Sequence, residues 1–409
     1  MTRAQMDSLA RGVKWWQAAP ATASTDADTW PEARADIWRL MLGLCVGSML
    51  LIPFNPVALT GDPAIYRAGV AQVFSGGIPY LEVDLEGQLP VSVLPMLAAW
   101  ILGGHLGAGL YTVIFAVLMA ACLLGTAFLV EAVGGELGMP HGGARFLILA
   151  GPVFSLVLFR LDPWAALLAA AALSAMVVDD QRRSFVLQVA AVLSKGWAVV
   201  FAAVEWIRGR RARAFALVGA LVAVLAGLLL TPGFRAARAF GGIHTDTMVG
   251  STLALVRTAL GEPVGRFDAA GAIYLEAPAW AVPVNVNIGL VLATVALISV
   301  SAPLTRLGIV KLTGALVVAL LIASPLLSPQ FVIWPIPFLA LHPSRLVRLI
   351  TLAVASLTIL FMLGWNPMYI GSLWWLPLVG LRNLALLALG VVTAWSVRSQ
   401  DEPAPAEPR

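Results

Sequence analysis

Acidic and tyrosine side chains gather in one short polar stretch of the chain, residues 60–88. Asp62 and Tyr66 stand near its beginning, and Asp84 and Glu86 stand near its end. A carboxylate can take a proton from a hydroxyl group, so this stretch has the residue types that a general base requires. Long apolar segments flank the stretch, and an ionisable residue beside a membrane is a candidate functional residue.

Two basic residues stand within or beside apolar segments later in the chain. Lys195 interrupts the apolar run 184–206, and Arg160 lies just before Asp162 at the border of another run. A cation in such surroundings is costly unless it is paired or hydrated. Both cations are therefore candidate functional residues.

The composition places these residues in a membrane protein. Of 409 residues, 60% are hydrophobic and 12% are charged, and the mean hydropathy is +0.88. Apolar blocks of spanning length recur, which predicts an all-α polytopic bundle of about 10–12 transmembrane or half-membrane helices. We expect a cytoplasmic segment over residues 1–38, the membrane domain over 39–396 and a disordered cytoplasmic tail over 397–409.

Cysteine and histidine do not suggest a disulfide framework or a metal site. Cys45 and Cys122 both lie in apolar blocks, where a thiol usually packs as a small buried group. The four histidines are scattered, without the spacing of a zinc site. The net charge of +4 comes from basic residues clustered in short loops, which indicates membrane topology rather than nucleic-acid binding. We therefore expect no metal, no cofactor and no nucleic acid.

Clusters of Lys and Arg mark the loops on the cytoplasmic side. They lie at 34–39, 179–183, 208–213, 306 and 342–348. This places the loop 60–88, with an amphipathic helix after Asp62, and the large loop 232–282 outside. The number of crossings between the first outer loop and the next basic cluster must be odd. We therefore expect the short, proline-containing block 89–104 not to cross the membrane.

The apolar run 184–206 raises the same question of crossing. A single helix would put the basic clusters before and after it on opposite faces. Two half-helices that meet at Ser194-Lys195-Gly196 would keep both clusters inside and place Lys195 in the outer half of the bundle. All the polar sites of interest then lie on the outer face.

The order of these polar segments resembles that of the GT-C membrane glycosyltransferases, in particular glycosyltransferase family 87, whose members use polyprenyl-phosphate mannose. The matching segments are Asp62, Tyr66, Gly77-Ile78-Pro79-Tyr80, Glu86, Pro90, Arg160 to Trp164, Ser194-Lys195 and Leu327-Ser328-Pro329-Gln330-Phe331. Each motif is short, and the resemblance rests on their order and shared face. Asp162 stands where the family carries Gln or Asn, and no aromatic pair follows Glu86.

This resemblance implies a GT-C-like fold and an inverting hexosyltransferase. The enzyme would move a sugar, mannose in that family, from a polyprenyl-phosphate carrier to a lipid-linked or cell-envelope glycan. The carrier, the acceptor and membrane lipids are its expected partners. The active site would face the extracytoplasmic side of the inner membrane, with Asp62 as the base that takes the proton of the acceptor.

Each of these site residues also has an ordinary structural interpretation. Asp62 and Asp162 both precede a proline and could cap a helix. Lys195 could extend to the interface from the end of a span. In the functional interpretation Lys195 and Arg160 bind phosphate, and Asp162 contacts substrate. Glu86 orients the acceptor or replaces Asp62 as the base, unless it is merely solvated.

Four further residues are candidate substrate contacts. Tyr66 and Tyr80 belong to the motifs that carry the resemblance. Gln330 could contact the donor sugar or lie at the membrane interface. His244, with Asp246 two positions later in the large outer loop, could bind the acceptor.

Two other classes of protein remain open from the sequence. A transporter or flippase of a lipid-linked sugar would show internal repeats and charge on both sides of the membrane. A non-catalytic assembly protein of the cell envelope would not require its outer acids for any activity. We expect the ordered motifs on one face to separate a transferase from both.

Overall fold

A computed structural model describes most of the chain. The described residues are 29–54, 60–83, 85, 88–231, 243–262, 264, 266–269, 272–300, 303–364 and 375–398. Most of the expected N-terminal segment, nearly all of the expected tail, Asp84 and Glu86 lie outside these residues, and nothing further is said of their structure.

Seven helices of the described residues are long and apolar enough to cross a membrane. They are α2 (Thr29–Leu51), α6 (Ala108–Glu136), α12 (Arg211–Leu229), α15 (Ala281–Ile298), α16 (Arg306–Ala323), α18 (Arg345–Gly364) and α19 (Trp375–Ser396). The chain is therefore a multi-pass helical membrane protein, as its hydropathy predicts. Most of α16 is buried inside the bundle, whereas α2 and α12 expose most of their residues.

Shorter helices complete the bundle. They are α4 (Asp62–Phe74), α5 (Val93–Ile101), α7 (Gly142–Ala150), α8 (Phe154–Val157), α9 (Asp162–Val177), α10 (Gln181–Ser194), α11 (Val200–Ile207), α14 (Met248–Ala259) and α17 (Ile336–Leu339). Short 3-10 helices link them: η1 (Ile52–Phe54), η2 (Pro90–Ser92), η3 (Gly104–Leu106), η4 (Gly151–Val153), η5 (Gly196–Val199) and η6 (Pro329–Ile333). The apolar segments 144–160 and 331–341 are interrupted at Pro152 and Pro335, where the missing N–H ends the regular hydrogen bonding.

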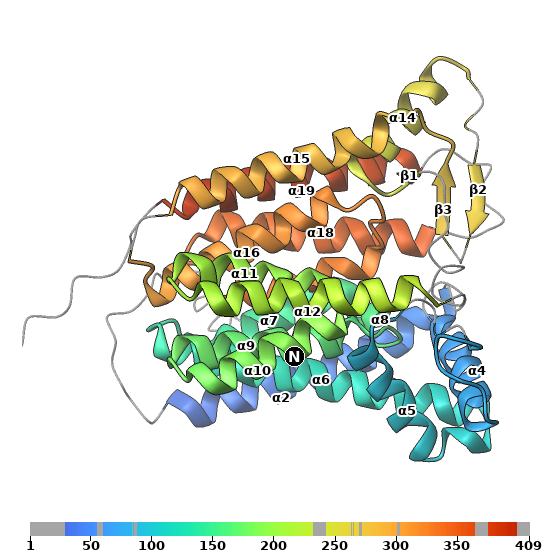
Figure 1. Ribbon diagram of the computed structural model, residues 1–409, viewed down its shortest axis with the longest axis horizontal. Helices are drawn as coiled ribbons and strands as arrows, with labels where there is room; N and C mark the ends of the chain where they lie inside the picture. The colour runs from blue at the N-terminus through green and yellow to red at the C-terminus, as the bar shows by residue number, and fades with distance from the viewer. Residues whose placement is uncertain are drawn as a thin grey trace, which may run out of the picture.

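The bundle has two distinct ends (Figure 1). The sheet end carries α4, α5 and three short strands. The arginine end is the other, and there Asp179 contacts Arg208 at 2.9 Å and Arg210 at 2.7 Å. Arg306, at the start of α16, lies 3.5 Å from Glu136 at the end of α6. Figure 1 also shows that α2 begins and α19 ends at the arginine end.

The break expected within the run 184–206 is confirmed. α10 ends at Ser194, Lys195 has an extended backbone (φ −140°, ψ 119°), and η5 and α11 follow. Arg208 after the run contacts Asp179 before it, so both basic clusters lie at one end of the bundle. The chain therefore enters the bundle and returns to the same end.

The expected non-crossing block 89–104 forms a short helix. α5 has nine residues, whereas about 20 are needed to cross a bilayer core. Arg67 of α4 donates a hydrogen bond to the carbonyl oxygen of Gly104 at 3.2 Å, and Phe74 stacks on Trp100 with ring centroids 5.7 Å apart. α4 and α5 therefore pack together at the sheet end.

A small antiparallel sheet departs from the all-α prediction. Its strands are β1 (Ile243–His244), β2 (Arg266–Ala269) and β3 (Ala272–Leu275), in the order β1-β3-β2. In its register Ile243 pairs with Leu275 and Phe267 pairs with Tyr274. Strands of two to four residues are too short for an alternating pattern to identify, which explains why the sequence did not predict them.

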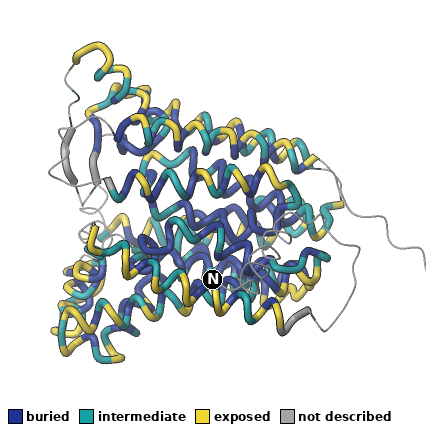
Figure 2. The backbone as a smooth tube through the Cα atoms, turned by 180° about the vertical axis from the view of Figure 1, so that it is seen from behind, coloured by how far each residue is buried: buried dark blue, intermediate teal, exposed yellow. Residues whose placement is uncertain are grey.

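Buried side chains concentrate along the interior of the bundle (Figure 2). α15 and α16 approach closely at Gly289, where an added Cβ would lie 2.4 Å from the carbonyl oxygen of Ala319. Asn285 of α15 donates hydrogen bonds to the carbonyl oxygens of Ile322 and Ser324, both at 3.0 Å. These contacts fix the end of α16 and the segment that follows it.

Candidate functional site

The carboxylate of Asp62 meets two other predicted site residues. It forms an ion pair with Arg160 and accepts a hydrogen bond of 3.0 Å from the hydroxyl of Tyr66. Asp62 begins α4, whereas Arg160 lies in the turn before α9. The side chain of Asp62 is 29% exposed and that of Arg160 is 11% exposed, so the carboxylate is the more accessible member of this pair.

Neither aspartate that precedes a proline caps its helix. Asp62 and Asp162 are the first residues of α4 and α9, and no side-chain hydrogen bond caps either helix. Pro63 and Pro163 occupy the first turns, where the missing N–H needs no acceptor. The capping interpretation is wrong for both aspartates, and their carboxylates make tertiary contacts instead.

Asp162 is buried and contacts an indole. Its carboxylate accepts a hydrogen bond of 2.7 Å from the ring nitrogen of Trp334, which follows η6. Asp162 also lies close enough to Arg160 to stabilise the charge of the guanidinium. A buried charge needs such compensation, so Arg160 and the two aspartates form one electrostatic group.

Lys195 reaches this group through aromatic rings. Its ammonium lies 5.9 Å from the ring centre of Phe331, within the range of a cation–π contact. Phe331 stacks on Trp334 with centroids 4.1 Å apart, and Trp334 stacks on Trp197 at 5.5 Å. Gln330 precedes Phe331 in η6 and is half-buried.

Residues of other elements fix the position of the break at Lys195. Ser92 of η2 donates a hydrogen bond of 2.6 Å to the carbonyl oxygen of Ser194. Trp164, in the first turn of α9, donates to the carbonyl oxygen of Val91 at 3.0 Å. η2 is thus bonded both to α9 and to the end of α10, which sets Lys195 relative to α9.

These contacts form one connected group, which we call the sheet-end cluster. Its members are Asp62, Tyr66, Arg160, Asp162, Lys195, Phe331 and Trp334, and Gln330 adjoins it as the residue before Phe331. The start of α4, the turn before α9, the break after α10 and η6 supply them, so four segments far apart in sequence meet at one place. The cluster combines a partly exposed carboxylate with two cations.

Tyr80 supports the loop after α4. Its hydroxyl donates a hydrogen bond of 2.9 Å to the carbonyl oxygen of Gln88, and burial raises the pKa of this hydroxyl to about 12. Its backbone φ of 65° is uncommon for a residue other than glycine and marks a tight turn. Tyr80 therefore shapes the loop that leads to Glu86, which itself lies outside the described residues.

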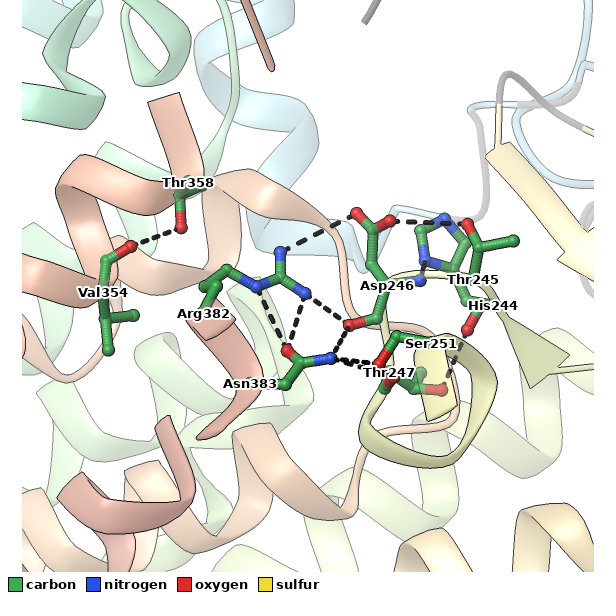
Figure 3. A network of polar contacts seen from close by, with 9 residues as sticks. All are labelled: His244, Thr245, Asp246, Thr247, Ser251, Val354, Thr358, Arg382 and Asn383. Carbon is green, nitrogen blue, oxygen red and sulfur yellow. Dashed lines mark hydrogen bonds and ion pairs between the residues drawn. The ribbon is translucent and has the colours of Figure 1, made fainter. Parts of the chain in front are cut away.

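A second polar network, which the sequence analysis missed, lies at the sheet end (Figure 3). Buried Arg382 of α19 donates to the backbone carbonyl of Asp246 and lies 3.9 Å from its carboxylate. Asn383 donates to the carbonyl oxygens of Asp246 and Thr247, both at 3.0 Å, and to the hydroxyl of Ser251 at 2.8 Å. These bonds hold the turn after β1 against α19. An arginine inside an apolar span was the signal that could have revealed the network.

His244 belongs to this second network. Its Nδ1 accepts a hydrogen bond of 3.3 Å from the backbone N–H of Asp246, and its own backbone N–H donates to Pro325 at 3.1 Å. Burial lowers the pKa of His244, Asp246 and the backbone of Leu327 oppose this shift, and Arg382 adds to it. The imidazole is buried and neutral, so the predicted contact with an acceptor requires this loop to move.

Buried charged residues also occur at the arginine end. Glu131, Arg145, Lys311 and Arg348 are all buried there. Glu131 accepts two backbone hydrogen bonds at the start of α7, and the two arginines donate to loop carbonyl oxygens. The predicted site residues that the structure describes still lie at the sheet end, but buried charge is not confined to that end, because helix ends at both ends of the bundle need partners for their backbone groups.

Comparison with known proteins does not assign the chain to a family. No protein-family model matches the sequence, and no curated protein matches it. Within the described residues, no group of three or more His, Cys, Asp or Glu side chains could hold a metal ion. Function must therefore be inferred from the residues and their geometry.

Proposed function

We propose that this protein transfers a sugar from a polyprenyl-phosphate carrier to a lipid-linked or cell-envelope glycan, with inversion at the anomeric carbon. The contact between the partly exposed carboxylate of Asp62 and Arg160 is the observation that supports this most. In this proposal the sheet end faces the extracytoplasmic side of the inner membrane. The resemblance to GT-C enzymes, and to family 87 in particular, makes mannose the first sugar to test.

The proposed reaction is a single displacement. The hydroxyl oxygen of the acceptor attacks the anomeric carbon, and Asp62 accepts the hydroxyl proton. The bond between the anomeric carbon and the phosphate oxygen breaks, and its electron pair leaves with the polyprenyl phosphate. Arg160 and Lys195 stabilise the negative charge on this phosphate.

The hydrogen bonding of Asp62 is compatible with the role of a base. A neighbouring guanidinium favours the ionised form of a carboxylate, which is the form that accepts a proton. Tyr66 occupies one carboxylate oxygen, but each of the two oxygens has two lone pairs, so acceptor capacity remains. Arg160 has five N–H donors and can contact a phosphate while it stays near Asp62.

The position of Arg160 also favours an anionic donor. α9 begins directly after it, and the N-terminus of a helix attracts phosphate through its free N–H groups and its dipole. Gln330 lies beside the ring that Lys195 covers, where its amide can donate to and accept from sugar hydroxyls. These residues supply the phosphate and sugar contacts of the proposal.

A direct assay tests the transferase. The purified protein is incubated with radiolabelled polyprenyl-phosphate sugars and a membrane lipid extract, and one donor is expected to give a labelled product. Lys195→Gln is expected to lose most of this transfer with little change in melting temperature. Glu82→Gln is the control, because Glu82 is an exposed acid at the sheet end that bonds only locally to Ile78. Absence of product with every donor would contradict the proposal.

Translocation of a lipid-linked sugar is the second candidate, because buried charged residues occur at both ends of the bundle. A flippase moves its substrate between leaflets without forming a glycosidic bond. Proteoliposomes that contain the protein and a labelled lipid-linked sugar distinguish the two functions. Movement of chemically unchanged lipid would favour the transporter, whereas a new labelled glycan would favour the transferase.

A further inference from the structure

Six arginines gather where α10 and α12 begin, at the arginine end. Three of them are committed to neighbouring groups. Arg208 and Arg210 contact Asp179, and Arg213 donates to the backbone and side-chain oxygens of Gln181, both at 3.1 Å. These contacts hold the starts of the two helices side by side.

The other three arginines are exposed, and no acid of the described residues lies within ion-pair distance of them. They are Arg182, Arg183 and Arg211. The acids nearby already have partners: Asp179 as above, Asp180 as the cap of α10, and buried Glu205 with Gln188 at 2.9 Å and Arg210 at 3.7 Å. Asp179 and Asp180 are exposed, but six arginines outnumber these three acids, so the surface carries a net positive charge.

Two aromatic rings lie next to these cations on the same surface. The guanidinium of Arg211 lies 5.2 Å from the ring centre of Trp206, and Trp206 meets Phe215 edge-on at 5.5 Å. Both rings are exposed, and Phe215 lies one helical turn farther along α12 than Arg211. Exposed valines then continue the surface on α10 and α12: Val186, Val218 and Val222.

This order of side chains matches the layers of a phospholipid leaflet. Basic side chains lie at the level of the phosphate, aromatic rings prefer the boundary between headgroups and chains, and aliphatic side chains contact the chains. α10 and α12 pack against each other, so the three layers form one continuous surface. A soluble ligand would use the cations but not the rings and valines.

We propose that the surface formed by Arg182, Arg183, Arg211, Trp206 and Phe215 binds an anionic phospholipid from the leaflet that meets the arginine end. Three cations favour a headgroup with net negative charge over a zwitterionic one. The site lies at the opposite end from the sheet-end cluster, and the inference does not depend on the proposed function.

Lipid titration of the purified full-length protein in detergent tests this site. Phosphatidylglycerol is added in one arm, phosphatidylcholine in a second, and inorganic phosphate or glycerol phosphate in a third. Native mass spectrometry counts bound lipid, and the melting temperature reports stabilisation. We expect phosphatidylglycerol to remain bound and to raise the melting temperature by several degrees, and the other additives to have little effect.

Two triple variants with equal loss of charge locate the binding. The triple variant R182Q/R183Q/R211Q is expected to lose the effect of phosphatidylglycerol. The control R306Q/R345Q/R398Q removes three exposed arginines elsewhere at the same end and is expected to keep it. If phosphatidylglycerol raised the melting temperature of the two variants equally, the proposed site would be wrong.

The unmodified protein decides the question even where the first variant does not fold. Equal retention of phosphatidylcholine and phosphatidylglycerol in native mass spectrometry would overturn the proposal. An equal stabilisation by soluble phosphate would also overturn it, because the ligand would then be an anion rather than a lipid. Selective retention of phosphatidylglycerol, with none for soluble phosphate, supports it.

Discussion

Two aspartate–arginine pairs lie at the sheet end of this protein, and they differ in exposure. The side chains of Asp62 and Arg160 are 29% and 11% exposed, whereas those of Asp246 and Arg382 are 4% and 1% exposed. The first pair joins the start of α4 to the turn before α9. The second joins a loop turn to the middle of an apolar helix.

The partners around each pair differ in the same way. Arg382 donates to the side-chain oxygen of Asn383, and Asn383 donates to the carbonyl oxygen of Asp246, so the groups of the buried pair are already hydrogen-bonded and have little freedom to exchange partners. Besides Arg160, the carboxylate of Asp62 contacts only Tyr66 of its own helix among the bonds described here. The same two residue types therefore form a buried structural clamp in one place and a partly exposed ion pair in the other.

The largest expected effect is a loss of transfer without a loss of stability when Asp62 is replaced. Asp62→Asn keeps the shape of the side chain but removes its basicity, and transfer is expected to fall by about 100- to 10,000-fold. Its melting temperature should stay within a few degrees of the wild-type value, because the side chain is partly exposed. Turnover at the wild-type rate in purified Asp62→Asn would exclude this residue as the base.

The buried pair should respond in the opposite sense, through stability. Arg382→Met leaves the carboxylate of Asp246 buried without its cation, and the free energy of unfolding is expected to fall by about 3–5 kcal/mol. The double variant with Asp246→Asn should lose less than the sum of the two single variants, because no uncompensated charge remains. Additive losses in SDS or denaturant titrations would show that the two residues do not act as a pair.

A third aspartate tests whether a neutral donor can take the place of an arginine. Trp334→Phe removes the N–H that Asp162 accepts, with an expected loss of about 1–3 kcal/mol. Trp197→Phe is the matched control, because the buried indole nitrogen of Trp197 has no hydrogen-bond partner in the described residues. An equal loss in both variants would mean that ring packing, and not the bond to Asp162, determines the effect.

Tyr66→Phe should have a smaller effect on the exposed pair. The ring stays packed against Phe115, with centroids 5.4 Å apart, and the hydroxyl bond to Asp62 is lost. We expect a loss of stability of about 0.5–1.5 kcal/mol. The pH profile of transfer should also shift, since one donor to the carboxylate is gone. An unchanged profile would remove Tyr66 from the role of orienting the base.

The smallest expected effect is the part of the pH dependence of stability that comes from His244, beside the buried pair. The pKa of His244 is lowered in the folded state, so below the ordinary value the unfolded chain binds more protons at this residue than the folded protein does. Its contribution to stability is present above pH 6.5, the ordinary value, and is lost as the pH falls below it. In His244→Gln, the melting temperature should fall less between pH 7 and pH 5 than it does in the wild type. An equal slope of melting temperature against pH in the two proteins would contradict this.

The sequence predicted the helical segments better than it predicted their neighbours. Hydropathy and basic loops were sufficient for the seven long helices, for the short block around α5 and for the break at Lys195, because these depend on position along one axis. They did not predict the interruptions at Pro152 and Pro335. Asp62, Arg160 and Lys195 were found as polar interruptions of apolar surroundings. Their contacts could not be predicted, because lateral packing between helices leaves no mark in a hydropathy pattern.

The sequence analysis missed several features because the type of a residue does not show which group its side chain contacts. Trp334 stands in an aromatic-rich segment, where an indole usually indicates an interfacial anchor rather than a partner for an acid. Arg382 lies within an apolar span, and no sequence pattern links it to the turn at Asp246 that it binds. Buried Glu131 and Arg145 at the arginine end were not predicted either; they satisfy backbone groups at helix ends, a demand that exists at both ends of the bundle.

The hydrogen bond from Ser92 to Ser194 makes the return of the chain at Lys195 dependent on a much earlier segment. A hairpin that reverses within hydrocarbon exposes carbonyl groups at its tip, and here the donor comes from η2, which the ribosome completes first. The donor is therefore synthesised before the hairpin that needs it. Loss of this hydrogen bond in Ser92→Ala is expected to weaken the return of the chain at Lys195.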